Sequence, residues 1–212
     1  MARPKVPLLS VDRIADAALE LVDSGQPFGV NALARRLGVT ASSLYNHVDG
    51  RDGIIELMRG RISRDAGTAD AGSSAERADG DWPEIVAESM RAQRRMYAKH
   101  PNLVPLIVGK TITDPYVIES YDHLATVLAA AGFPDDEVLG VVAVLDAFAI
   151  GMGLDLASPD DVWKPGDETE TETLGRLLAD APHGDERSDR AFELGLELMI
   201  DSLRGRLARI RG

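Results

Sequence analysis

The sequence predicts an all-α protein in which a small N-terminal three-helix head, residues 1–50, precedes a larger helical domain. Apolar residues recur at steps of three and four along most of the chain, which is the spacing of one face of a helix. Only 5% of the 212 residues are aromatic, and the abundance of alanine and leucine favours helix over sheet. We expect a connector helix at about 51–64 and the larger domain at 65–212.

The first helix is predicted to begin after Ser10, whose hydroxyl can cap the free amide groups of the first turn. Ile14, Leu21 and Val22, with alanines between them, form an apolar stripe along one side. The sequence Ser-Gly-Gln-Pro at 24–27 ends this helix. Residues 1–7 hold Arg3 and Lys5, so this tail either lies along a polyanion or is idle.

The next two helices are predicted to form a helix-turn-helix between residues 30 and 48. Gly38 falls where the first of them must end, because glycine adopts the left-handed conformation without steric cost. Thr40 is placed to cap the second. Leu33 and Leu44 point to the same side as the other apolar residues of these two helices. The outer face of the second helix carries hydroxyl, amide and imidazole groups but no acid, which suits a negatively charged polymer such as DNA.

Residues 10–58, with LARRLGVTASSLYNHV at their centre, resemble the tetracycline-repressor (TetR) family of bacterial transcriptional regulators. The resemblance is specific there and only architectural beyond residue 60. The sequence departs from the family at Gly29, where a Thr or Ser cap is usual, and at Asn31, where Arg is common. The resemblance implies phosphate contacts by one set of residues and base contacts by another. The first set is Thr40, Ser43, Tyr45, His47 and Arg51, and the second is Ala41, Ser42 and Asn46.

The net charge of −12 is distributed unevenly along the chain. Residues 1–60 hold seven Lys or Arg and seven Asp or Glu, so the whole excess of acid lies in residues 61–212. The larger domain would then repel DNA everywhere except at the head. Surface acid that simply confers solubility is an equally good and compatible explanation.

Beyond the connector, turn residues separate a series of further helical segments. Residues 65–81 are small, polar and without period, which predicts a flexible linker or surface loop. Residues 157–172 form an acidic loop that holds Trp163. The segments predicted to be helical or apolar are 82–100, 102–109, 115–131, 136–154, 173–180 and 188–209.

A small-molecule cavity is expected among the segments 82–100, 102–109, 116–131 and 136–154. Polar groups near the apolar stripe of the first segment would orient a ligand that is otherwise mostly apolar. The expected ligand-binding residues are Gln93, Tyr97, His100, Phe148 and Met152. Alternatively, Gln93 and His100 are satisfied core or capping residues. The sequence leaves three roles open for Asp146, a carboxylate in an apolar helix. It is a pocket residue, a hydrogen-bonding group between helices, or part of a surface at which another helix packs.

Residues 136–154 are apolar around almost the whole circumference of the helix, which therefore must be covered on every side. Residues 188–209 carry a similarly broad apolar stripe. One chain covers part of these surfaces, so we expect a homodimer built from both segments. Two-fold symmetry would place the two reading helices about 34–36 Å apart, one turn of DNA.

Several classes of protein are disfavoured by what the sequence lacks. There is no cysteine, which excludes disulfides and thiolate metal sites and fits the cytoplasm. The four histidines show no metal-ligand spacing, and no nucleophile elbow or phosphate-binding loop occurs. We therefore expect no enzyme activity, metal or cofactor. The longest apolar stretch, 138–154, contains Asp146 and falls short of about 20 residues, which favours a buried helix over a membrane span.

These features together predict a TetR-like repressor that binds double-stranded DNA as a homodimer and is released by a small-molecule effector. The alternative is a small-molecule-binding helical dimer without specific DNA binding. An enzyme grown inside the helical cavity is a distant third hypothesis.

Overall fold

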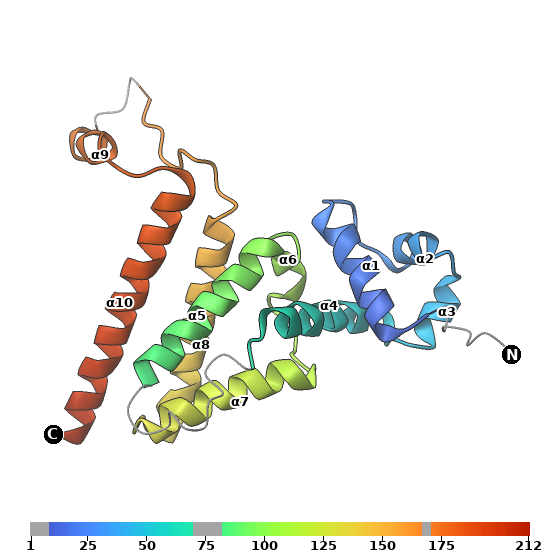
Figure 1. Ribbon diagram of the computed structural model, residues 1–212, viewed down its shortest axis with the longest axis horizontal. Helices are drawn as coiled ribbons and strands as arrows, with labels where there is room; N and C mark the ends of the chain where they lie inside the picture. Colours follow the sequence, from blue (N-terminus) through green and yellow to red (C-terminus); the bar gives the residue numbers. More distant parts are fainter. Residues whose placement is uncertain (1–8, 70–81, 167–170) are drawn as a thin grey trace, which may run out of the picture.

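The computed structural model describes residues 9–69, 82–166 and 171–212, and every regular element within them is an α-helix (Figure 1). The predicted all-α fold is thereby confirmed. In chain order the helices are α1 (Val11–Asp23), α2 (Val30–Leu37), α3 (Ala41–Tyr45), α4 (Gly50–Ala66), α5 (Trp82–Lys99), α6 (Val104–Ile107), α7 (Pro115–Ala130), α8 (Asp135–Asp155), α9 (Glu172–Leu178) and α10 (Gly184–Arg211). The predicted tail at 1–7, most of the predicted linker at 65–81 and part of the loop at 157–172 lie outside the described residues.

The head consists of α1, α2 and α3 packed about one small core. Ser10 caps α1 by accepting a hydrogen bond from the Arg13 amide at 3.2 Å. Gly38 ends α2 in the left-handed conformation, with φ of 69°, as its position predicts. Ile14, Leu33 and Leu44 are completely buried between the three helices. Three short helices bury too little surface to be stable alone, so a fourth element is needed.

The connector α4 supplies that element and joins the head to the larger domain. Its Ile54 and Met58 are fully buried in the core of the head. The same apolar cluster continues into α5 and α6 through Met96 and Val104. Figure 1 shows α4 running from the head into the middle of the molecule. The head and the larger domain are therefore physically continuous through one helix.

The larger domain is organised about α5 and α8, which pack along each other with α7 and α10 on either side (Figure 1). Phe148 of α8 stacks on Phe192 of α10, with ring centroids 5.4 Å apart and planes 15° apart. Trp82 meets Phe133 edge-on at 5.8 Å and closes one end of this core. The helix α8 is long and apolar enough to cross a membrane, judged by length and composition alone. Within one chain, 28% of its most apolar 18-residue stretch is buried.

Two helices differ from the sequence-based expectation at their ends. The last helix begins at Gly184 rather than near 188, because contacts from other helices hold its first turn. Arg94 of α5 donates to the Ser188 hydroxyl at 2.9 Å, and Arg187 pairs with Asp155 at 2.9 Å. The helix α3 ends at Tyr45, with Asn46 as its C-cap, and does not continue as a helix to 48.

The crossing of α5 and α8 depends on a residue without a side chain at Gly153. A Cβ atom there would lie 2.7 Å from the Cβ of Tyr97 and 3.1 Å from the carbonyl oxygen of Arg94. We predict that Gly153→Ala lowers the free energy of unfolding by about 1–3 kcal/mol, because the helices must move apart. Urea unfolding followed by circular dichroism measures this change.

Gly175→Ala is the matched control, because a Cβ at that position in α9 would meet nothing within 4 Å. This variant should leave the stability unchanged or raise it by up to about 1 kcal/mol through helix propensity. Equal effects of the two substitutions would contradict the close approach at Gly153.

Candidate functional site

The outer surface of α3 is polar and is fixed in place by two buried apolar residues. Leu44 and Val48 anchor it in the head. Thr40 caps the helix by accepting a hydrogen bond from the Ser43 amide at 3.2 Å, and its hydroxyl lies 3.0 Å from that of Ser42. The residues expected to contact DNA are intermediate or exposed: Thr40, Ala41, Ser42, Ser43, Tyr45, Asn46, His47 and Arg51. Hydrogen-bonding groups are thus presented outward on a rigid support.

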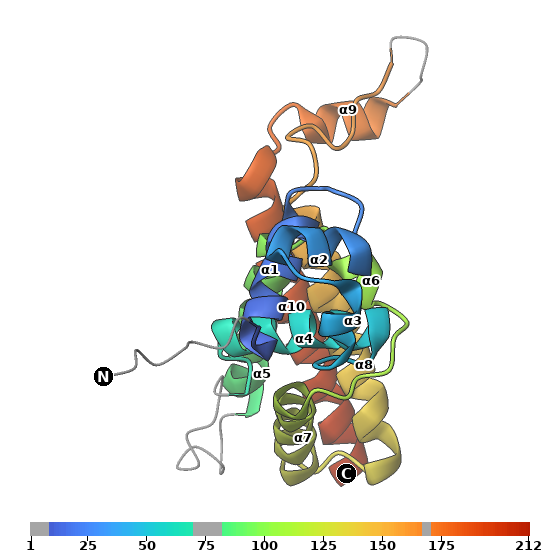
Figure 2. The same ribbon diagram turned by 90° about the vertical axis from the view of Figure 1, so that its right-hand side faces the viewer.

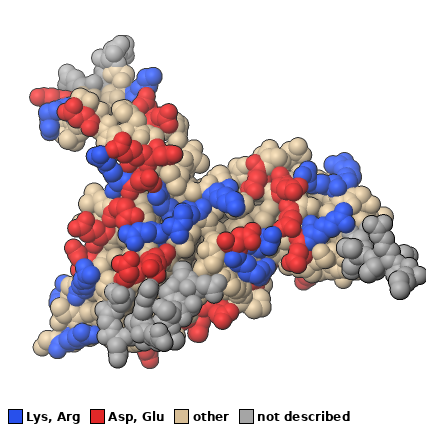
Figure 3. Space-filling model, in the orientation of Figure 1, with Lys and Arg blue, Asp and Glu red and all other residues tan. Residues whose placement is uncertain are grey.

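Two side chains extend this surface beyond α3. Tyr45 is an exposed aromatic residue at the end of α3. Arg51, in the first turn of α4, places its guanidinium 5.3 Å from the centre of the Phe28 ring. Figure 2, in which the head faces the viewer, shows α3 beside the start of α4. In Figure 3 basic and acidic side chains are interspersed over the visible face, so it carries no continuous surface of one sign.

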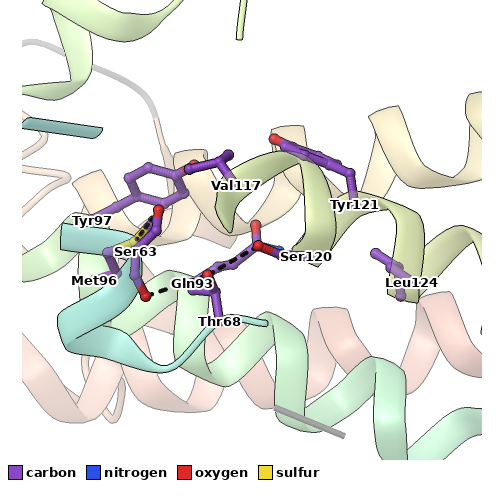
Figure 4. Close-up of a pocket in the computed structure, with 9 residues that line it drawn as sticks. All are labelled: Ser63, Thr68, Gln93, Met96, Tyr97, Val117, Ser120, Tyr121 and Leu124. Carbon is purple, nitrogen blue, oxygen red and sulfur yellow. Dashed lines mark hydrogen bonds between the residues drawn. The ribbon is translucent and has the colours of Figure 1, made fainter. Parts of the chain in front are cut away.

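A second candidate site lies among α4, α5, α7, α8 and the exposed loop after α6. It consists of two adjoining hollows of about 180 and 20 Å³ that share Ser63, Tyr97, Val117 and Tyr121 as walls. The larger hollow is also lined by Arg59, Lys110, Asp146 and Ile150. In the smaller hollow (Figure 4) the hydroxyl groups of Thr68 and Ser120 form a hydrogen bond of 3.2 Å, and Gln93 lies beside them.

Of the five residues expected at the cavity, only Gln93 and Tyr97 line it. His100 lies beyond the end of α5, where its Nδ1 is 2.9 Å from Asp23 of α1. Phe148 and Met152 lie on the side of α8 that faces the core with α10. The structure therefore does not bring these three residues to this cavity. Positions 146 and 150 instead share the face of α8 that lines the cavity, since they are one helical turn apart.

The cavity contains polar residues that the sequence analysis did not assign to it. Arg59 and Ser63 come from α4, which had been interpreted only as a connector. Tyr121 comes from α7 and is not among the expected ligand contacts. In the sequence, Asp146 was the residue that could have indicated these polar surroundings, because a lone carboxylate in an apolar helix needs hydrogen-bond donors or a shifted pKa.

The carboxyl group of Asp146 lies in an unfavourable setting. Burial raises its pKa, while hydrogen bonding by Tyr121, the charge of Arg59 and hydrogen bonding by Tyr97 offset part of that rise. Its Oδ1 atom is buried without a hydrogen-bond partner. Burial also raises the pKa of both tyrosines, with the nearby Asp146 charge acting in the same direction. Both phenol groups therefore remain protonated at neutral pH.

The wall formed by α4 is tied to the start of α7 by charged groups. Glu56 accepts hydrogen bonds from the amides of Thr113 and Asp114 at 2.8 and 3.3 Å. Asp114 caps α7 and pairs with Arg64 of α4 at 3.1 Å. A change in the position of α7 would therefore be transmitted to α4. Within the described residues, no group of three or more His, Asp or Glu side chains could hold a metal ion.

Asp146→Asn should remove a pH-dependent cost of folding. Because the folded state raises the pKa of this carboxyl above its ordinary value of 3.8, it binds the proton more tightly than the unfolded chain. The wild type therefore loses stability as the pH rises from about that value through the raised pKa. The stability advantage of the asparagine variant should grow over this range and then level off, as measured by denaturant unfolding.

Asp136→Asn provides the control, since Asp136 is exposed in the first turn of the same helix. An Asp146→Asn advantage that stays constant across the titration would show that the carboxyl is not destabilised by burial.

Comparisons with known proteins agree with this architecture. The sequence model described as the tetracyclin repressor-like C-terminal domain matches residues 75–207. An HTH-type transcriptional repressor, DrrR1 of Streptomyces coeruleorubidus, is 26% identical over 71% of this chain and 54% of its own length. An HTH-type transcriptional regulator of Saccharopolyspora erythraea is 30% identical over 78% of this chain and 66% of its own length. The chain thus spans about half to two thirds of these relatives.

Solved structures are similar over almost the whole chain. Apo ActR of Streptomyces coelicolor superposes with a TM-score of 0.77 and 25% identity, covering 97% of this chain and 99% of that one. ActR in complex with actinorhodin gives 0.72 and 25% over 93% of this chain and 96% of that one. The matched C-terminal domain accounts for more than half of the sequence, and the helix-turn-helix precedes it. The chain belongs to the tetracycline-repressor (TetR) family of transcriptional regulators.

Proposed function

We propose that this chain is a cytoplasmic, ligand-responsive transcriptional repressor that binds a near-palindromic operator as a homodimer and is released from DNA by a small molecule. The observation that carries the proposal is the double role of α4. Its Ile54 and Met58 complete the core of the head, while Arg59 and Ser63 form part of the cavity wall. A ligand in the cavity thus contacts the helix that positions the head. Regulation of this kind requires no catalytic step.

DNA recognition is assigned to the polar surface of α3 and the start of α4. Tyr45, His47 and Arg51 are exposed at its edge, which suits contacts with phosphates. Thr40 and Ser43 serve the same purpose at the other end of the helix. Ala41, Ser42 and Asn46 are assigned to base edges, because short side chains let the helix approach the floor of the major groove.

Dimerisation is assigned to α8 and α10, whose outer faces are not covered by the other described residues of the chain. Leu194 and Leu198 of α10 are 57% and 62% exposed. Gly140 and Gly151 of α8 have open space around them, so another helix can approach closely. Apolar surface of this extent is typical of a subunit interface rather than of a monomer. A two-fold axis between the paired helices would present two heads to successive turns of DNA.

Effector binding is assigned to the cavity and its effect to a shift of α4. The structure of ActR in complex with actinorhodin supports a small-molecule effector for this chain. An effector need only favour a conformation in which the heads no longer match the operator spacing. A difference of about 1–3 kcal/mol between the two conformations would weaken DNA binding about 5–150-fold, and DNA would weaken effector binding equally.

The alternative, a small-molecule-binding dimer without specific DNA binding, has one observation in its favour. The helix α2 begins at Gly29 without a side-chain hydrogen bond to its first turn, so it is less well fixed than a capped helix. Protection of the DNA around the protein's own gene, with and without candidate ligands, distinguishes the two functions. A genuine ligand that leaves DNA affinity unchanged at saturation would favour the alternative.

Tyr45→Ala should weaken binding to all DNA duplexes alike, because a phosphate contact carries no sequence information. Substitutions of Asn46 should instead change which sequence is preferred, by about 1–3 kcal/mol at the affected base pair. Fluorescence anisotropy with a panel of duplexes measures both effects. The control is Trp163→Ala, since Trp163 is an aromatic residue of the same exposure, 54% against 55%, outside the head. Unchanged affinity of Tyr45→Ala on every duplex would refute the assignment.

Leu198→Asp should convert the dimer to a monomer, because a charge would be buried at the centre of the paired α10 helices. Light scattering at micromolar concentration should show the mass of one chain, and a footprint should lose its second half-site. Ile118→Asp serves as the control, since Ile118 is 48% exposed on α7, away from the proposed interface. A monomeric wild type would remove the basis for this assignment.

A further inference from the structure

We propose that the effector is a protonated amine joined to an apolar body about the size of one aromatic ring, and that Asp146 binds its ammonium group. The inference rests on the proposed function, because it names the chemical class of the ligand for the same cavity. It also changes the earlier expectation of a mostly apolar ligand, since it gives that ligand one positive charge at a defined place.

Asp146 has hydrogen-bonding capacity that the described residues do not satisfy. Its side chain lines the larger hollow, and its Oδ1 atom is buried without a partner. Buried carboxylate oxygens in folded proteins almost always accept a hydrogen bond. Gln93 Oε1, in the adjoining hollow, is likewise buried without a partner. Both vacant acceptors would be satisfied by N–H groups of a ligand.

The balance of charge around the cavity also favours a cationic ligand. Two cationic residues line the larger hollow, and each already has its own carboxylate. Arg59 Nε lies 3.1 Å from Glu56 Oε1, and its Nη2 donates to the carbonyl of Ile107 at 2.8 Å. Lys110 Nζ lies 3.0 Å from Asp52. These two pairs are neutral overall, so Arg59 compensates the charge of Asp146 only in part, and a cation is the ligand that balances the remainder.

The shape and surface of the larger hollow suit a ligand with one aromatic ring. Its volume of about 180 Å³ is slightly above the roughly 150 Å³ of an engineered cavity that binds benzene. Val117 and Ile150 supply apolar surface for a ring. The rings of Tyr97 and Tyr121 line the same space, and aromatic rings attract an ammonium group through their faces. A single-ring amine therefore fits both the size and the chemistry of the walls.

The test uses the full-length protein and three probes of similar size, each with one benzene ring. These are 2-phenylethylamine, which is a cation at neutral pH, 2-phenylethanol, which is a neutral donor, and 3-phenylpropanoate, which is an anion. Titration calorimetry should show that the amine binds at least about tenfold more tightly than the alcohol. No binding of the anion is expected, because it would face the Asp146 carboxylate.

Variants locate the effect at one residue. Asp146→Asn should weaken binding of the amine about tenfold or more and leave the alcohol unchanged. The matched control Asp136→Asn, on the exposed first turn of α8, should leave all three probes unchanged. Amine binding that survives Asp146→Asn overturns the proposal. So do failure of the wild type to bind the amine and equal binding of the three probes. If Asp146→Asn does not fold, the relative affinities of the wild type for the three probes still test the proposal.

The proposed function can fail separately. If the amine binds through Asp146 but leaves DNA affinity unchanged at saturation, the ligand class is supported and the release mechanism is refuted. If DNA is released by a neutral or anionic ligand and the amine does not bind, the mechanism stands and the ligand class is refuted.

Discussion

One helix takes part in two packed regions, and the rest of the structure depends on this sharing. The N-terminal half of α4 buries Ile54 and Met58 against α1, α2 and α3, without which the head would have too small a core. Its C-terminal half contributes Arg59 and Ser63 to the cavity wall. Because a helix is held rigid by its own hydrogen bonds, neither half can move without the other. Coupling between the two regions thus follows from packing.

The cavity combines apolar packing with polar groups that the fold itself leaves incompletely satisfied. Tyr97, Tyr121 and Asp146 come from three different helices, and their proximity is stabilising only when a partner supplies the missing hydrogen bonds. Burial of an incompletely paired carboxylate costs stability, so this arrangement is not explained by folding alone. A cost of this kind is common at binding sites, where ligand specificity depends on it.

The position of α10 is set by an arginine buried beside it. Arg94 of α5 donates to Asp189 at 2.7 Å and to Ser188 at 2.9 Å, and its guanidinium lies 4.7 Å from the centre of the Phe192 ring. These contacts hold the inner face of α10 on the larger domain. The outer face, which carries Leu194 and Leu198, remains uncovered by the part of the chain that the structure describes. One helix thereby serves the core on one side and, in the proposed dimer, the partner on the other.

The sequence by itself determined the helical class, the order of the helices and the helix-turn-helix. The reason is that these depend on local signals: the caps at Ser10 and Thr40, the left-handed turn at Gly38, and apolar periodicity. Only the tertiary structure decided which residues meet at the cavity. The helix α8 is apolar on nearly every side, so its pattern could not indicate that Asp146, rather than Phe148, faces the cavity. Likewise, His100 pairs with Asp23 of α1, a residue 77 positions away. Such contacts depend on how helices cross, which periodicity within one helix does not encode.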